Sequence, residues 1–301
     1  MTNDPMTNDP MTNDPMTIMT VQTLKKIRSV GKMLNALAAV SPTLAGRVAF
    51  RIFCTPKRLV LGEKDQAFLA TATHSTWRME GLSMRSYIWE SSKPNAPTIL
   101  FLHGWESNAA RWHKYIKAAR NAGFRVQAFD APASGFSDGK LLNVLLYSRA
   151  VKKFIAENDA PYAIVGHSLG GAAAVMSLAL LGAKRPQKMA VLASFAETTR
   201  VIRDFAHILG ANESVLHALF RHIERRSGLP IEEYSVRKRA AELSDVEGFV
   251  LHDHGDEVAP VAEGQAIAEA WGCRFLQTEG FGHRMQDKVV VHEVLGFLRQ
   301  D

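Results

Sequence analysis

The feature that most limits how this chain can fold is a repeated alternation of short apolar runs and helical patterns from about residue 75 onward. The apolar runs are residues 98–102, 124–129, 162–165, 189–193, 248–251 and 273–277. Continuous apolar runs of this length are typical of strands buried on both faces, whereas residues 82–88 alternate in polarity as an edge strand does. Strands that alternate with helices predict an α/β fold with a mostly parallel sheet flanked by helices.

Residues 195–245 interrupt this alternation. They are rich in charge, helical in pattern, and contain no strand-like run. We therefore expect a small helical cap inserted into an α/β domain that spans residues 63–301.

Two further segments precede this domain. Residues 1–15 are three copies of one polar, proline-containing pentapeptide, so residues 1–19 are predicted to be a disordered repeat tail. Residues 20–62 predict a helical arm. Apolar residues spaced by three and four up to Leu37 indicate an amphipathic helix, and a second helix is expected after Pro42.

The positive charge of the chain is concentrated in this arm. The formal net charge is +6, and the arm has no Asp or Glu but eight basic residues: Lys25, Lys26, Arg28, Lys32, Arg47, Arg51, Lys57 and Arg58. Residues 63–301 are nearly neutral, so no nucleic-acid partner is expected. The arm is interpreted as packing on its own domain, and the alternative is a weak membrane-surface contact through residues 21–58.

Composition limits the class of protein and its compartment. Hydrophobic residues make up 47% of the chain, which is enough for a large core. Cys54 and Cys273 are too few for a disulfide scaffold and are predicted to be free thiols. No stretch approaches the roughly 20 apolar residues of a membrane-spanning helix, and none resembles a signal peptide. We expect a cytoplasmic protein, and its oligomeric state is left open.

The pattern Gly-x-Ser-x-Gly at residues 166–170 is the main candidate for chemistry. Ser168 follows an apolar run without a gap, and small residues on both sides would let the chain turn sharply from strand into helix. Ser137 lies in a second match at residues 135–139, but Pro132 places a loop between it and the preceding strand. Ser168 is therefore the predicted nucleophile.

A serine hydroxyl needs an imidazole to accept its proton and a carboxylate to orient that imidazole. Two later loops, each after an apolar run, supply these groups: Asp256 as the acid and His283 as the general base. Asp253 competes for the acid role, but it stands at the strand end and is expected to cap the turn. The resulting order along the chain is Ser, Asp, His.

With these motifs in this order, the chain resembles the α/β-hydrolase superfamily over about residues 75–300. The resemblance rests on residues 102–105 (LHGW), 129–132 (FDAP), 166–171 (GHSLGG), 253–256 (DHGD) and 282–284 (GHR). One departure is residues 132–135 (PASG), where relatives often carry Pro-Gly-His-Gly. It leaves the three catalytic positions intact but leaves the shape of that side of the pocket open.

The resemblance implies further site residues. The backbone N–H groups of Trp105 and Leu169 are expected to form an oxyanion hole. His103, Phe136 and His167 are expected near the substrate pocket. His103 can also be read as a residue that positions the oxyanion loop, and His167 as one that packs beside the serine turn.

The implied activity is hydrolysis of a carboxylic ester through an acyl-enzyme on Ser168, with a small-molecule acyl substrate and with no cofactor or metal. Thioester, lactone and carbon–carbon bond cleavage use the same groups and stay open. A dehalogenase is disfavoured because its nucleophile is a carboxylate.

Two other interpretations belong to different classes. His252, His254 and Asp256 resemble part of a zinc site, but Glu257 stands where that motif needs another histidine. The chain could also be a non-catalytic binding module on a hydrolase fold. This second alternative is disfavoured because all three catalytic residue types are present.

Overall fold

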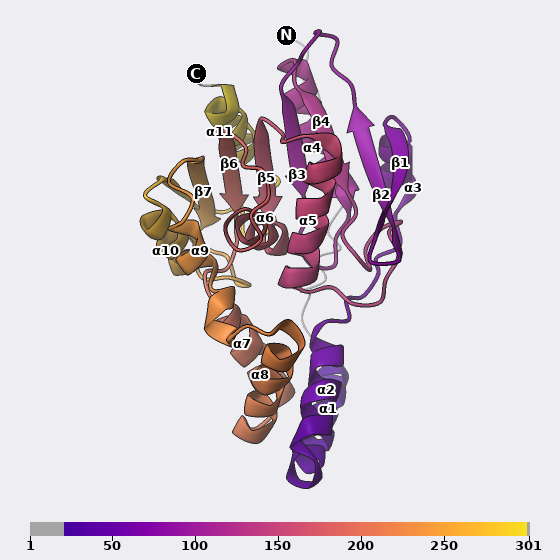
Figure 1. Cartoon of the computed structure of the whole chain (residues 1–301), viewed down its shortest axis with the longest axis vertical. Coiled ribbons are helices and arrows are strands. Elements are labelled where there is room, and N and C mark those ends of the chain that lie inside the picture. Colours follow the sequence, from indigo (N-terminus) through magenta and orange to yellow (C-terminus); the bar gives the residue numbers. More distant parts are fainter. Residues whose placement is uncertain (1–20, 300–301) are drawn as a thin grey trace, which may run out of the picture.

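The computed structural model describes residues 21–299 and contains one eight-stranded sheet with helices on both sides (Figure 1). The strands are β1 (Thr73–Met79), β2 (Leu82–Trp89), β3 (Thr98–Leu102), β4 (Arg125–Phe129), β5 (Ala163–His167), β6 (Lys188–Leu192), β7 (Glu247–Asp253) and β8 (Arg274–Thr278). Their order across the sheet is β1-β2-β4-β3-β5-β6-β7-β8. The predicted tail, residues 1–19, lies outside the described residues.

The helices are α1 (Val21–Val40), α2 (Pro42–Phe53), α3 (Glu63–Leu69), α4 (His113–Asn121), α5 (Val144–Asn158), α6 (Leu169–Ala179), α7 (Thr198–Leu209), α8 (Glu213–Ser227), α9 (Val236–Ala240), α10 (Val261–Trp271) and α11 (Lys288–Arg299). Short 3-10 turns occupy Ala109–Trp112 and Ile231–Tyr234.

The strands from β4 across to β8 run parallel, and those from β4 to β7 are buried on both faces, whereas β8 at the edge is partly exposed. In β3, Leu100 and Leu102 join the apolar cluster that contains α5, α6 and α10, while Ile99 and Phe101 join the cluster that contains α4 and α11. All four side chains are fully buried. This mostly parallel sheet between two helical layers confirms the α/β prediction.

The prediction of residues 82–88 as an edge strand is wrong. β2 pairs with β4 on one side and with β1 on the other, both in antiparallel register, so β1 forms this edge of the sheet. β1 has no apolar pattern that would predict it, because most of its side chains are polar and exposed. A tight turn joins the two strands, and Glu80 and Gly81 both have positive φ, as such a hairpin requires.

Four helices form a separate module, α1, α2, α7 and α8, beyond the carboxyl ends of the parallel strands, at the lower end of Figure 1. α2 packs closely on α8, since a Cβ atom at Gly46 would lie 2.2 Å from the carbonyl oxygen of Ala218. Asn35 of α1 donates to the carbonyl oxygen of Gly210 at 3.0 Å. The predicted apolar face of α1 is used here, and Leu34 is fully buried. The arm therefore packs on the inserted segment.

The segment predicted as one insert, residues 195–245, divides in two. Helices α7 and α8 belong to the four-helix module, whereas α9 packs on α6 and α10 beside the sheet. The amide N–H of Val236, at the start of α9, donates to the carbonyl oxygen of Ala196 at 2.8 Å. None of the helices within residues 21–299 is long and apolar enough to cross a membrane.

Candidate active site

Ser168 occupies a strained turn between β5 and α6. Its backbone has φ 52° and ψ −121°, a conformation that residues other than glycine rarely adopt. The flanking glycines make the turn possible: a Cβ atom at Gly166 would lie 2.6 Å from Cα of Gly171, and one at Gly170 would lie 2.3 Å from the carbonyl oxygen of Leu102. The Gly-x-Ser-x-Gly pattern thus has a steric cause at both glycines.

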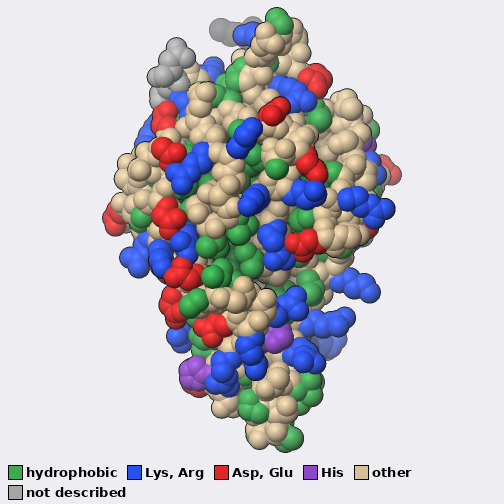
Figure 2. Space-filling view, in the orientation of Figure 1, with side chains coloured by type: hydrophobic (Ala, Val, Ile, Leu, Met, Phe, Trp, Pro, Cys, Tyr) green, Lys and Arg blue, Asp and Glu red, His purple; other side chains and the backbone are tan. Residues whose placement is uncertain are grey.

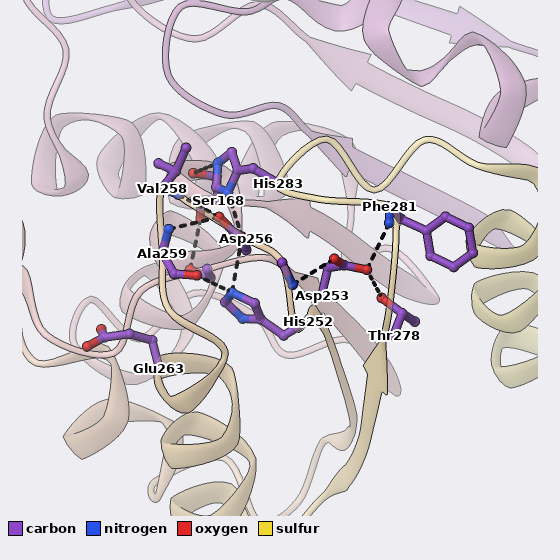
Figure 3. Close-up of polar contacts among 12 residues, drawn as sticks. Ser168, His252, Asp253, Asp256, Val258, Ala259, Glu263, Thr278, Phe281 and His283 are labelled. Atoms are coloured by element: carbon purple, nitrogen blue, oxygen red, sulfur yellow. Dashed lines mark hydrogen bonds and ion pairs between the residues drawn. The ribbon is translucent and has the colours of Figure 1, made fainter. Parts of the chain in front are cut away.

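Ser168, His283 and Asp256 form one hydrogen-bonded chain (Figure 3). Oγ of Ser168 lies 3.1 Å from Nε2 of His283, and Nδ1 of His283 lies 2.8 Å from Oδ2 of Asp256. A carboxylate can only accept, so Nδ1 carries the proton and Nε2 is free to accept one from the serine. The structure therefore brings together the three residues that the sequence predicted.

Asp256 is held by more than His283. Its Oδ1 accepts the amide N–H groups of Val258 at 2.8 Å and Ala259 at 2.9 Å, and its Oδ2 lies 3.1 Å from Nε2 of buried His252. Burial by itself would raise the pKa of the Asp256 carboxyl group, but the hydrogen bonds from His252 and His283 outweigh burial and hold this pKa well below its usual range. Asp256 is therefore a carboxylate at neutral pH.

Asp253 has a different task from Asp256, as Figure 3 shows. Its Oδ2 accepts the Thr278 hydroxyl at 2.9 Å and the amide N–H of Phe281 at 3.0 Å. These bonds connect the end of β7 to the loop after β8, which carries His283. Asp253 therefore fixes the position of that loop and makes no contact with the imidazole.

His167 supports the same loop from the other side. Its Nε2–H group donates to the carbonyl oxygen of His283 at 2.7 Å, and the two rings meet edge to face at 4.9 Å. Burial, aided by the positive charge of Arg111 and by His283, holds the pKa of His167 well below its ordinary value. His167 is therefore a neutral positioning group.

The two residues predicted for an oxyanion hole flank Ser168. β3 and β5 are neighbours in the sheet, so the loop after β3 lies against the serine turn. A Cβ atom at Gly104 would lie 3.1 Å from Cβ of Ser168, and Trp105 is the next residue. Leu169 is the first residue of α6, where amide N–H groups have no partner within the helix.

His103 is fully buried behind this loop. Its Nδ1–H group donates to the carbonyl oxygen of Gly104 at 2.8 Å, and its Nε2 accepts the amide N–H of Ala131 at 2.9 Å. Burial lowers the pKa of His103, which keeps Nε2 free to accept. His103 thus ties two loops together and has no ring nitrogen left for substrate.

Ser137, the serine of the second motif, is buried and has structural partners. Its hydroxyl donates to the carbonyl oxygen of Asp130 at 2.6 Å and accepts the amide N–H of Arg85 at 2.9 Å. The neighbouring Phe136 is 53% exposed at the surface. Ser137 therefore connects its loop to β2 and to the end of β4, which is a structural role.

A cavity of about 570 Å³ lies between the carboxyl edge of the sheet and the four-helix module. Ser168, His283, Trp105 and Leu169 line it on the sheet side. The three residues predicted for the pocket do not line this cavity, and this part of the prediction is wrong: His103, Phe136 and His167. Sequence proximity to the motifs did not reveal that these side chains point into the fold or to the outer surface.

The cavity also has lining residues that the sequence did not suggest. Phe50 and Phe53 come from α2, and Phe205 comes from α7. Helix α2 ends more than 40 residues before the first hydrolase motif, and no pattern within the arm indicated a role in the substrate pocket. Its tertiary contacts, foremost the packing of α2 on α8, bring the arm to the cavity.

The zinc interpretation is not supported by this geometry. His252 and Asp256 are buried, whereas His254 is exposed and its amide N–H bonds to the carbonyl oxygen of Thr278. Within residues 21–299, no group of three potential ligands is placed to hold a metal ion. Both cysteines are free, as predicted, and burial raises the pKa of the Cys54 and Cys273 thiols to about 12.

The alpha/beta hydrolase family matches residues 99–292. A search of curated proteins finds no match. The enol-lactonase from Burkholderia xenovorans LB400 has a similar structure, with a TM-score of 0.57 and 18% sequence identity over 75% of this chain and 100% of that chain.

Two other solved structures are similar at the level of the fold. A membrane phospholipase A, described as a bacterial virulence factor, has a TM-score of 0.58 at 14% identity over 79% of this chain and 90% of that chain. The thioesterase domain from the curacin biosynthetic pathway has a TM-score of 0.55 at 16% identity over 76% and 99%. At these identities the likeness concerns the fold alone.

Proposed function

Because the chain belongs to the alpha/beta hydrolase family, we propose that it is a serine hydrolase that cleaves a carboxylic ester or a related acyl bond through an acyl-enzyme on Ser168. The observation that carries this proposal is the hydrogen-bonded chain from Asp256 through His283 to Ser168 at the wall of a cavity. Such a chain lets a serine hydroxyl lose its proton as it attacks a carbonyl carbon.

The reaction follows from the positions of these groups. Nε2 of His283 accepts the proton of the Ser168 hydroxyl while Oγ bonds to the carbonyl carbon. The same nitrogen then protonates the leaving alcohol, and the acyl group remains on the serine. Water, deprotonated by His283, releases the acid. Asp256 stays a carboxylate throughout and stabilises the imidazolium.

The developing negative charge on the carbonyl oxygen is assigned to the backbone N–H groups of Trp105 and Leu169. Trp105 follows Gly104, whose backbone lies against Ser168, and Leu169 is the first residue of α6, so both amides are close to the serine. Loss of one donor of this kind typically lowers the rate by about 10²–10³.

An ester is the simplest substrate for this site, and lactones and thioesters are the alternatives. All three present a carbonyl carbon with an oxygen or sulfur leaving group. The similar solved structures include a phospholipase, an enol-lactonase and a thioesterase domain, which supports this range. Carbon–carbon bond cleavage uses the same groups and is the further alternative.

A fluorophosphonate probe tests the nucleophile. Wild type should be labelled, and Ser168→Ala should not. Ser137→Ala is the matched control, because this serine lies in the other Gly-x-Ser-x-Gly match but is buried without an imidazole partner. Labelling of Ser168→Ala would contradict the assignment. Failure of wild type to label would favour a non-catalytic binding module.

A further inference from the structure

The far wall of the cavity is made by the N-terminal arm. Helix α2 and the two residues after it contribute Phe50, Ile52, Phe53, Cys54 and Thr55 to the lining. All five precede the region matched by the family, which begins at residue 99. The cavity therefore has a wall that the shared hydrolase region does not supply.

This wall is fixed firmly to its surroundings. The close contact of Gly46 with Ala218 holds α2 on α8, and the amide N–H of Leu142 donates to the carbonyl oxygen of Cys54 at 2.7 Å. A Cβ atom at Gly31 would lie 1.9 Å from the carbonyl oxygen of Leu209, so α1 is equally close to α7. The arm is built into the cavity as a structural part.

Aromatic rings close the cavity between the helices. The rings of Phe53 in α2 and Phe205 in α7 lie 5.0 Å apart. The ring of Phe50 contacts His222 of α8 at 5.1 Å and lies 5.3 Å from the guanidinium carbon of Arg226. Figure 2 shows hydrophobic side chains gathered on the surface where the broad sheet domain meets the narrower module.

Among residues 21–299, three cations line the cavity: Arg226 lies over the ring of Phe50, and the other two are paired with carboxylates. Arg149 lies 2.7 Å from Glu80, and Arg200 lies 2.9 Å from Glu263. The other lining residues on the module side are mainly apolar: Val201, Ile202, Ile208, Ile223 and Ile231. A surface of this kind favours an uncharged hydrocarbon chain over a polar group.

We propose that helix α2 is the acyl-chain wall of this enzyme and that Phe53, with Phe205 opposite it, sets a preference for medium-length to long acyl chains. The proposal rests on the proposed function, because it takes Ser168 as the point where the acyl carbonyl is held. The chain then extends from Ser168 between the sheet and the four-helix module.

A series of p-nitrophenyl esters tests this preference: acetate, butyrate, octanoate and laurate. For wild type, kcat/KM should rise about fourfold for each methylene group that enters the cavity. Phe53→Trp, which narrows the cavity, should lower the ratio of laurate to acetate kcat/KM at least tenfold. Phe53→Ala, which widens it, should shift the best substrate to a longer chain.

Arg51→Ala is the matched control, because Arg51 lies on the same turn of α2 and its side chain is exposed. Its chain-length profile should equal that of wild type. A profile that falls steadily from acetate, or one that is unchanged in both Phe53 variants, would overturn the proposal.

A binding measurement separates this proposal from the catalytic one. Titration with N-methyldodecanamide, which has its twelve-carbon chain on the acyl side as laurate has but is not an ester, reports on the wall without ester hydrolysis. Tighter binding to wild type than to Phe53→Trp supports the wall even if no probe labels Ser168. Equal binding to both variants counts against the wall even if labelling succeeds.

Discussion

Ser168 carries backbone strain that its neighbours maintain. Its amide N–H donates to the carbonyl oxygen of Leu192 at 2.8 Å, and its own carbonyl oxygen accepts the hydroxyl of Ser194 at 2.9 Å and the amide N–H of Ala172 at 3.1 Å. These bonds hold a φ of 52°, which costs a residue with a side chain about 1–2 kcal/mol.

Replacing Ser168 should reveal this cost. Glycine adopts the conformation without strain, so Ser168→Gly should be about 1–2 kcal/mol more stable than Ser168→Ala. Urea unfolding of the two variants measures the difference. Equal stability would mean that the turn is not strained in solution.

Stability should also depend on pH through the buried imidazoles His103 and His167. Burial lowers the pKa of both groups. Just below about pH 6.5 both rings are therefore still neutral in the folded chain, whereas the same rings in the unfolded chain bind protons. The free energy of unfolding should therefore fall as pH decreases below about 6.5, by about 1.4 kcal/mol per pH unit for each such proton.

Denaturant unfolding between about pH 5.5 and 6.5 measures this slope above the range where ordinary carboxyl groups titrate. Carboxyl groups with a lowered pKa, such as Asp256, lose their contribution only at lower pH. His167→Gln should have a shallower slope than wild type. An unchanged slope would show that His167 is not the group responsible.

At the scale of residues, the sequence predicted which side chains form the catalytic site better than it predicted where neighbouring side chains point. Ser168, Asp256 and His283 could be predicted because each lies in the turn or loop that follows a strand and because their order matches one reaction. The roles of His103, just after β3, and His167, at the end of β5, depend on the direction in which each ring points. That direction is decided by packing, for which a single sequence holds no signal.

At the scale of elements, the contact between α2 and α8 depends on the absence of a side chain at Gly46. Gly46→Ala should gain helix propensity of about 1 kcal/mol but place a methyl group against the backbone of Ala218. Because backbone must shift, we expect a net loss of about 1–3 kcal/mol in the free energy of unfolding.

Gly296→Ala is the control for this substitution. Gly296 also lies inside a helix, α11, but a Cβ atom there would have no neighbour within 4 Å. This variant should be as stable as wild type or more stable. Thermal unfolding of both variants is the measurement, and a stabilised Gly46→Ala would argue against tight packing of α2.

The elements that could be predicted were those with a strong local pattern. The buried strands stand out because parallel strands covered on both faces are apolar throughout. β1 was missed because an exposed edge strand needs no apolar pattern. Tertiary contacts separate α9 from α7 and α8. Residues 195–245 are rich in charge throughout, so no local pattern marks where the four-helix module ends.

At the scale of the whole molecule, the basic arm remains a candidate for contact with an anionic membrane surface. The amphipathic face expected for this contact is occupied by packing on α7 and α8. All eight basic side chains of the arm are nevertheless exposed. Any attraction should therefore be electrostatic and shallow, at about 1 kcal/mol for each basic residue near the surface.

Co-sedimentation with vesicles tests this prediction. The protein should bind vesicles that contain phosphatidylglycerol, not pure phosphatidylcholine, and high salt should release it. Combined Lys25→Glu and Lys26→Glu should weaken binding more than Lys114→Glu and Lys117→Glu in α4, which change the charge equally. Equal effects would show that the arm has no special part.

The position of the arm is the feature of the whole molecule that lay furthest beyond sequence reasoning. Its two helices could be predicted from spacing and from Pro42. Their partner helices, however, follow about 150 residues later, and the contact depends on shape complementarity at positions such as Gly31 and Gly46.

The bond between Asn35 and Gly210 spans 175 residues of sequence, and it has a consequence for how the molecule is assembled. During synthesis the first two helices must wait for most of the chain before their partners exist, so the cavity is among the last parts to form. A ligand bound between α2 and α7 would contact both a helix that is synthesised early and a helix that is synthesised much later. Occupancy of the cavity would then stabilise the complete chain against unfolding and leave shorter, unfinished chains unprotected.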